Sequence, residues 1–283
     1  MSRMCIFCGE RATSMEHVLP NWLNPILNEE TQRRPDSGWV MHMAGNEGVE
    51  RRCFQKKEIA SIKTRQVCHD CNILWMSRLE SRAKPVLIPL TEGRTTSLTV
   101  NEQILIATWA TKTAMVAETT LSRNDRFPKE ECSLVMLQDR PPASVEVIAT
   151  AIEGLIPPLN FSLAQFEGTP NDGGELFQMH FYTLQVGTLV LQIVRRIPPV
   201  PNYGTLERVR TPREIDLTPG LAIPIFPPLG VVRWPGSVTL DWEGFVHFCR
   251  RGIEMPSGWT PPNPGSPDSH QDPFPEGKPG VSL

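Results

Sequence analysis

The sequence predicts an α+β protein, and three observations lead to this class. Two Cys-x-x-Cys pairs lie in the first quarter of the chain. Apolar residues over 101–121 suit a long helix, with Asn101 as its N-cap and Glu102 in the first turn. The segments 176–184 and 188–197 alternate or run apolar around Gly187, which predicts a β-hairpin.

The cysteine pairs predict a metal site. Each pair places two sulfurs on one tight turn, and 59 residues separate the two pairs. Four such thiolates are the ligand set of a tetrahedral structural zinc, which would stabilise an N-terminal unit with little core of its own. The expected ligands are Cys5, Cys8, Cys68 and Cys71. Alternative ligands nearby are His69, His42 and Cys53.

The N-terminal elements follow from this site. Residues 1–22 are expected to form a cysteine knuckle and a short strand, and residues 23–57 an irregular insertion with a strand at 38–43. A strand at 59–67 then leads into a helix at 69–82, which Pro85 should end. In that helix Trp75 is expected to pack under the zinc, and Trp22 to cover the same small core.

The remaining elements are assigned from local pattern. A helix is expected at 143–153, after two prolines. Pro and Gly make up 12 of the last 28 residues, which predicts a disordered tail from 256 to 283. Further short elements are strands at 221–226 and 231–234 and a helix at 242–250. The predicted domains are 1–95, 96–255 and the tail.

Composition favours a reducing compartment. Seven cysteines are present, and the three outside the pairs are isolated, so a disulfide framework is not expected. The first residues contain no apolar signal segment, and no stretch approaches the ~18 apolar residues of a membrane-spanning helix. The sequence therefore predicts a soluble cytoplasmic protein without a membrane partner.

A second motif lies between the cysteine pairs. Glu16 and His17 precede Pro20, and Asn72 directly follows the last cysteine. This order resembles the zinc-ribbon branch of the HNH (His-Me finger) endonucleases over residues 1–85. The segment from 71 to 90 is also similar to actinobacterial and phage proteins described as HNH-like. The resemblance implies a ββα-metal fold, phosphodiester hydrolysis in DNA, and a role in phage biology or defence.

The resemblance also implies roles for individual residues. His17 would be the general base, because an imidazole titrates near neutral pH. Glu16 and Asn72 would hold a catalytic Mg²⁺ or Mn²⁺ ion with their oxygens. Asn46 would be the middle asparagine that braces the loop, with Asn21 and Asn24 as alternatives. The chain departs from the family in having Glu16 where Asp is commoner, and in a longer separation between His17 and Asn72.

Charge supports a polyanionic substrate near this motif. Residues 1–95 hold 14 Lys/Arg and 11 Asp/Glu, whereas residues 96–283 hold 14 and 20. The candidate nucleic-acid contacts are Arg51, Arg52, Lys56, Lys57, Lys63 and Arg65, with Arg78 on the following helix.

Two other functions are compatible with the sequence. The motif could be a zinc scaffold that has lost cleavage and binds nucleic acid or a protein partner. Alternatively, residues 96–255 could bind an acidic or small partner while the zinc unit stabilises the fold. The acidic second half, the long insertion and Glu16 favour the first of these alternatives.

Overall fold

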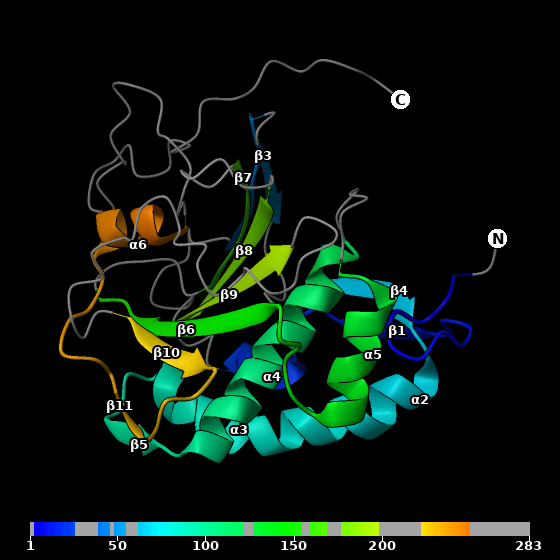
Figure 1. Ribbon diagram of the computed structural model, residues 1–283, viewed down its shortest axis with the longest axis horizontal. Helices are drawn as coiled ribbons and strands as arrows, with labels where there is room; N and C mark the ends of the chain where they lie inside the picture. Colours follow the sequence, from blue (N-terminus) through cyan, green and yellow to red (C-terminus); the bar gives the residue numbers. More distant parts are fainter. Residues whose placement is uncertain are drawn as a thin grey trace.

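The structure is a computed structural model that describes residues 3–25, 39–45, 48–54, 62–120, 127–153, 159–168, 177–197 and 222–249 (Figure 1). Helices combine with a seven-stranded mixed sheet and two small antiparallel sheets. The predicted α+β class is therefore confirmed. The predicted tail, Asn46, Lys56 and Lys57 lie outside the described residues.

The N-terminal region has the order strand, strand, helix. Strand β1 (Ser14–His17) pairs antiparallel with β4 (Lys63–Val67), and a continuous helical segment follows directly. That segment consists of α2 (His69–Cys71), the π-helix η2 (Asn72–Met76) and α3 (Ser77–Thr91). A short 3₁₀-helix, η1 (Asn21–Leu23), follows β1.

The segment predicted as an irregular insertion contains a hairpin. Strand β2 (Trp39–Gly45) pairs with β3 (Gly48–Phe54), and β2 also pairs in parallel with β7 (Leu159–Gly168). The expected strand at 38–43 corresponds to β2, but β3 and β7 were not predicted. The hairpin extends the large sheet at one edge.

Two helix boundaries differ from the prediction. Helix α3 does not end at Pro85 but continues through Pro85 and Pro89 to Thr91. Helix α4 (Val100–Glu118) begins after Thr99, not at Asn101, because Thr99 and Glu102 form a capping box. Thr99 Oγ1 accepts from the Glu102 amide at 3.3 Å, and the Glu102 carboxylate accepts from the Thr99 amide at 2.8 Å.

The predicted helix at 143–153 is wrong, because this segment forms strand β6 (Val145–Ala151). Val145, Val147 and Ala149 are buried, so the alternation of a strand decides the conformation. Helix α5 (Lys129–Gln138) precedes it and was not predicted.

The hairpin around Gly187 is confirmed as β8 (Phe177–Val186) and β9 (Leu189–Ile197). Gly187 has φ +55°, and a Cβ there would lie 2.3 Å from the carbonyl oxygen of Thr91, so a side chain is excluded. The other elements are β5 (Thr96–Leu98), β10 (Ile223–Phe226), β11 (Val232–Trp234) and α6 (Trp242–Cys249).

The elements form layers around one main core. The large sheet has the order β10-β6-β9-β8-β7-β2-β3. Helix α4 lies between α3 and the sheet, where it contacts β9 and β10, while α6 contacts β7 and β8 (Figure 1). One cluster of buried apolar residues includes Leu87 and Trp109, so the described parts of the two predicted domains share a hydrophobic core. No helix in the described part is long and apolar enough to cross a membrane.

Candidate functional site

The first cysteine pair lies on a closed turn. The amide of Gly9 donates to the carbonyl of Cys5 at 3.0 Å, and the amide of Cys5 donates to the carbonyl of Glu10 at 2.7 Å. Gly9 has φ +80°, a conformation that favours glycine, so the residue after Cys8 lets the chain reverse direction. Both sulfurs are thereby held on one side of the knuckle.

The second pair begins the long helical segment. Cys68 is the N-cap residue of α2, and its sulfur accepts a hydrogen bond from the amide of Cys71 at 3.4 Å. The amide of Asn72 donates to the carbonyl of Cys68 at 3.1 Å. Two ligands of the predicted site therefore also start the helix that follows β4.

The four sulfurs lie together. All four Sγ atoms are within 4.8 Å of one another, and those of Cys8 and Cys68 are 3.5 Å apart. A tetrahedral zinc with Zn–S bonds of about 2.3 Å would separate its sulfurs by roughly 3.8 Å. Burial and the charge of Cys5 raise the pKa of Cys71, so a cation is needed to keep several thiolates in this volume. The cluster can hold a zinc ion, as the sequence predicts.

Aromatic and sulfur contacts fix the cluster to the rest of the protein. Phe7 meets Trp75 edge to face, with ring centroids 4.8 Å apart. Met136 Sδ lies 3.7 Å from Cys71 Sγ, and Ser133 Oγ donates to the carbonyl of Phe7 at 2.7 Å. The expected packing of Trp75 is confirmed, and helix α5 covers the knuckle.

The two-stranded sheet of β1 and β4 separates the two residues of the predicted dyad. Side chains alternate along a strand, and the buried pattern of β1 places Glu16 on its inner side. Met15 is 45 % exposed on the outer side, which the half-buried His17 shares. Lys63 is the cross-strand partner of His17, and Arg65 Nε donates to Met15 Sδ at 2.8 Å. His17 therefore lies on an outer face with two exposed cations.

Asn72 contacts the same strand from the helix. Its side-chain nitrogen donates to Ser14 Oγ at 2.6 Å. Ser14 lies two residues before Glu16, and the β1–β4 register shifts between them. The structure thus brings Asn72 to the start of β1, while the buried Glu16 and the half-buried His17 follow at its end.

Glu16 is buried, and the charge of a buried lysine that the sequence analysis did not single out acts on it. Glu16 is 6 % exposed. Lys112 on α4 is fully buried, and its ammonium lies 2.7 Å from Glu80 Oε1 on α3. Burial raises the pKa of Glu16 to about 7, with the charge of Lys112 opposing this shift and that of Glu80 adding to it.

These surroundings do not fit a divalent cation at Glu16. The only group of three or more Cys, His, Asp or Glu side chains close enough to share a metal, within the described residues, is the cysteine cluster. His69 is not part of it. The side chains of His42 and Cys53, on β2 and β3, are not described.

The predicted nucleic-acid contacts occupy separate places. Arg51 and Arg52 lie on β3, at the edge of the large sheet, whereas Lys63 and Arg65 lie on β4. Asn21, an alternative to Asn46, begins η1. The predicted cluster is therefore divided between two sheets.

Arg78 lines a hollow of about 670 Å³ beside the cysteine cluster. The hollow is bounded by the first knuckle, the start of the long helical segment and the end of α5. Arg11 and His69 also line it, together with the exposed side chains of Leu74 and Leu137. Mixed charge and exposed apolar surface do not define one ligand class.

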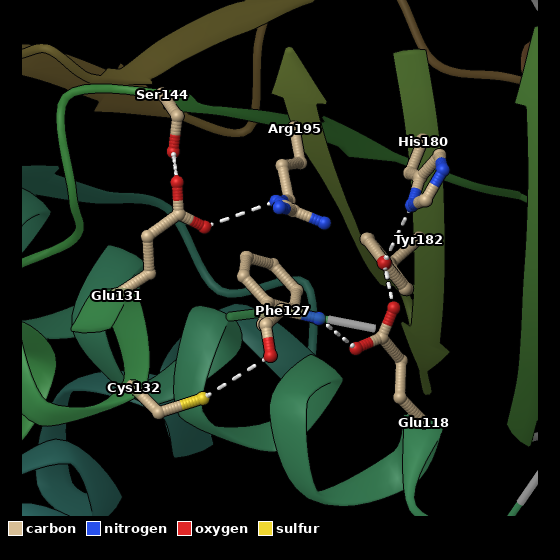
Figure 2. A network of polar contacts seen from close by, with 8 residues as sticks. All are labelled: Glu118, Phe127, Glu131, Cys132, Ser144, His180, Tyr182 and Arg195. Atoms are coloured by element: carbon tan, nitrogen blue, oxygen red, sulfur yellow. Dashed lines mark hydrogen bonds and ion pairs between the residues drawn. The ribbon is translucent and has the colours of Figure 1, made fainter. Parts of the chain in front are cut away.

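A second polar cluster joins helices α4 and α5 to the sheet (Figure 2). Tyr182 donates to Glu118, whose other oxygen accepts from the amide of Phe127 at 2.9 Å, and His180 Nδ1 lies 3.2 Å from the tyrosine oxygen. Beside it, Arg195 Nε lies 3.0 Å from Glu131 Oε2. All are at least largely buried, so the cluster has the character of a structural network.

Cys132 lies under this network and is chemically inert. Burial, together with the nearby charges of Glu118 and Glu131, raises the pKa of its thiol to about 12. The sequence does contain a signal for these buried charges. Lys112 and Glu118 lie in a helix whose other central residues are apolar or small. Charged side chains in such a helix require buried partners.

The comparisons with known proteins identify no relative: no family model, curated protein or solved structure matches the chain. The HNH resemblance thus remains a hypothesis drawn from the motifs.

Proposed function

We propose that the protein is an HNH-type endonuclease that hydrolyses phosphodiester bonds in DNA, with His17 as general base. The observation that carries this proposal is the position of His17 on the outer face of the β1–β4 sheet, directly opposite the exposed Lys63. The order of two antiparallel strands and a helix, with four cysteines gathered at their ends, supports it further.

In the proposed reaction, His17 takes a proton from the attacking water as its oxygen bonds to phosphorus. The phosphorus–oxygen bond to the leaving sugar then breaks, and the leaving oxygen takes a proton from solvent. Lys63 and Arg65 lie on the same face and would neutralise charge that develops on the non-bridging oxygens of the phosphate. A zinc ion at the cysteine cluster would supply no chemistry of its own, but would fix the helix to strands β1 and β4.

The resemblance assigns Mg²⁺ or Mn²⁺ to Glu16 and Asn72. Three features argue against an ion there. The carboxyl of Glu16 is buried, the ammonium of Lys112 is nearby, and Asn72 is hydrogen-bonded to Ser14. The proposed reaction therefore takes no step through such an ion.

Cleavage by the zinc-loaded protein tests the proposal. Supercoiled plasmid and single-stranded DNA are incubated with the protein in Mg²⁺, Mn²⁺ or EDTA, and zinc content is measured afterwards because EDTA also removes structural zinc. His17→Ala should lower the rate by about 10²-fold or more. His69→Ala, which removes an exposed imidazole elsewhere on the surface, is the control. Equal rates for wild type and His17→Ala would reject the proposal.

A binding scaffold without cleavage is the second candidate. The same burial of Glu16 favours it, because a degenerate motif would no longer need an accessible carboxylate. Such a protein would bind nucleic acid or a protein partner through its exposed surfaces. It would show DNA binding, or binding of a protein partner, without cutting under any of the three cation conditions, and His17→Ala would leave that binding unchanged.

A further inference from the structure

The four cysteines of the cluster differ in their access to solvent. Cys5, Cys68 and Cys71 are buried, whereas Cys8 is partly exposed. The hollow of about 670 Å³ beside the cluster is lined by Cys8, Cys68 and Cys71, but not by Cys5. It is many times larger than the roughly 30 Å³ that one water molecule occupies, so it admits a small oxidant. Cys8 is therefore the sulfur that solvent reaches first.

The sulfurs of Cys8 and Cys68 are placed to form a bond between the two knuckles. They lie 3.5 Å apart, and a disulfide bond of about 2.05 Å requires them to approach by roughly 1.5 Å. Backbone amides orient both atoms. The amide of Glu10 donates to Cys8 Sγ at 3.4 Å. The amide of Cys71 donates to Cys68 Sγ, also at 3.4 Å.

We propose that Cys8 and Cys68 form an oxidation site for hydrogen peroxide, and that a disulfide between them displaces the structural zinc. This inference goes beyond the proposed nuclease and does not rest on it. The reduced chain holds zinc at the cluster, and the oxidised chain loses it.

The reaction begins at Cys8. Its thiolate attacks one oxygen of hydrogen peroxide, the oxygen–oxygen bond breaks, and the departing hydroxide takes a proton to become water. Cys8 then carries a sulfenic acid. The thiolate of Cys68 attacks the Cys8 sulfur, a sulfur–sulfur bond forms, and the sulfur–oxygen bond breaks to release a second hydroxide, which is also protonated to water. The two thiolates thus lose two electrons, and one peroxide molecule gains them.

The bridge removes two of the four ligands that the cluster offers to a zinc ion. Cys5 and Cys71 remain, and two thiolates do not complete the tetrahedral set of a structural site. The bond between Cys8 and Cys68 still joins the first knuckle to the start of α2, as a zinc ion would. The oxidised chain therefore keeps this part of the fold, and a thiol reductant can reverse the change.

Disulfide mapping of the zinc-loaded, full-length protein tests the site. The protein is treated with hydrogen peroxide, remaining thiols are alkylated, and unreduced peptides are identified by mass spectrometry. We expect a bridge between Cys8 and Cys68, with release of one zinc per chain measured by a chromogenic chelator. Dithiothreitol and added zinc should then restore the bound metal.

Two histidine variants separate this pair from the other ligands. Cys8→His and Cys5→His each keep four zinc ligands, because histidine replaces cysteine in many structural zinc sites. Peroxide should release zinc from Cys5→His at about the wild-type rate, since both bridging cysteines are present, and from Cys8→His at least about tenfold more slowly. Cys132→Ala, which lacks a cysteine outside the cluster, should match the wild type.

Several results would overturn the proposal. They are a wild-type protein that binds no zinc, zinc retained with the four thiols unoxidised, a bridge within either Cys-x-x-Cys pair or to a cysteine outside the cluster, and equal protection in both histidine variants. If a histidine variant does not bind zinc, the mapping of the wild type decides alone. No measurement involves DNA, so a failure of the proposed nuclease would leave this site unaffected.

Discussion

Asn72 donates a hydrogen bond of 2.6 Å to Ser14, and this contact fixes the first turn after Cys71 to strand β1. The cysteine cluster joins the same two segments, because one pair precedes β1 and the other begins the helix. A metal ion in the cysteine cluster, together with this side-chain hydrogen bond, would determine how β1 and β4 meet the helix. The amide of Asn72 has a structural partner whether or not the site is catalytic.

The Asn72–Ser14 contact should be measurable as a coupling energy. Asn72→Ala and Ser14→Ala should each lower the free energy of unfolding by about 1 kcal/mol. The double variant should lose less than the sum, with a coupling of roughly 0.5–1.5 kcal/mol, because the two changes remove one hydrogen bond. Urea unfolding of the four proteins gives the coupling. Strict additivity would show that the contact does not stabilise the fold.

Loss of the structural metal should destabilise the β1–β4 sheet together with the helical segment that follows it. Cys8→Ser should abolish binding of one zinc per chain and lower Tm by about 10 °C, since ligand binding to the native state contributes to folding. Zinc analysis and thermal unfolding followed by circular dichroism measure both effects. Cys132→Ala is the control: its thiol is buried away from the cluster and should leave the zinc content unchanged. Unaltered zinc content in Cys8→Ser would contradict the assigned ligand set.

The metal site was predictable because chelation depends on local spacing. A Cys-x-x-Cys turn presents two sulfurs whatever surrounds it, so the pairing of Cys8 with Cys68 needed only the assumption of one shared ion. The surroundings of Glu16 were not predictable in this way. Lys112 follows Glu16 by almost a hundred residues and reaches it only because α4 packs on α3. Residue type indicates that Lys112 needs a buried partner, but neither residue type nor spacing indicates that its charge acts on Glu16.

The fold shows the same limit. Gly187 between two apolar runs identified the β8–β9 hairpin from local pattern alone. For β6 the prolines before Val145 suit the start of a helix, whereas the alternation of Val145, Val147 and Ala149 suits a strand. Pairing within the sheet decides the conformation. Pro85 does not end α3, although proline disfavours a helix interior, because tertiary packing buries Ala83, Leu87 and Leu90 along one side.

The network around Tyr182 should stabilise the contact between α4 and the sheet. Tyr182→Phe removes the hydroxyl that donates to Glu118 and leaves that buried carboxylate with fewer donors. We expect the free energy of unfolding to fall by about 1–3 kcal/mol, with little change in zinc content. Chemical unfolding with a parallel zinc assay checks this. A change within about 0.5 kcal/mol would show that Glu118 is satisfied by other groups.

Glu16 should make the stability depend on pH in a direction opposite to that of the metal site. Its pKa is about 7 in the folded protein, against an ordinary value of 4.5. Between these values the folded chain holds a proton that the unfolded chain has lost, so the free energy of unfolding falls as pH rises. The stabilisation is complete below the unfolded pKa and is lost as pH passes through 7, a change of about 3 kcal/mol in order of magnitude.

Glu16→Gln isolates this contribution, because glutamine stays neutral. Zinc binding improves as pH rises, since its thiolates must lose protons, but this effect is present in both proteins and cancels in their difference. The stability of Glu16→Gln relative to wild type should therefore increase from about pH 5 to about pH 8, as measured by urea unfolding at each pH. A constant difference across that range would mean that the carboxyl titrates as it does in the unfolded chain. The charge of Lys112, which lowers this pKa, would then offset burial and the charge of Glu80, which raise it.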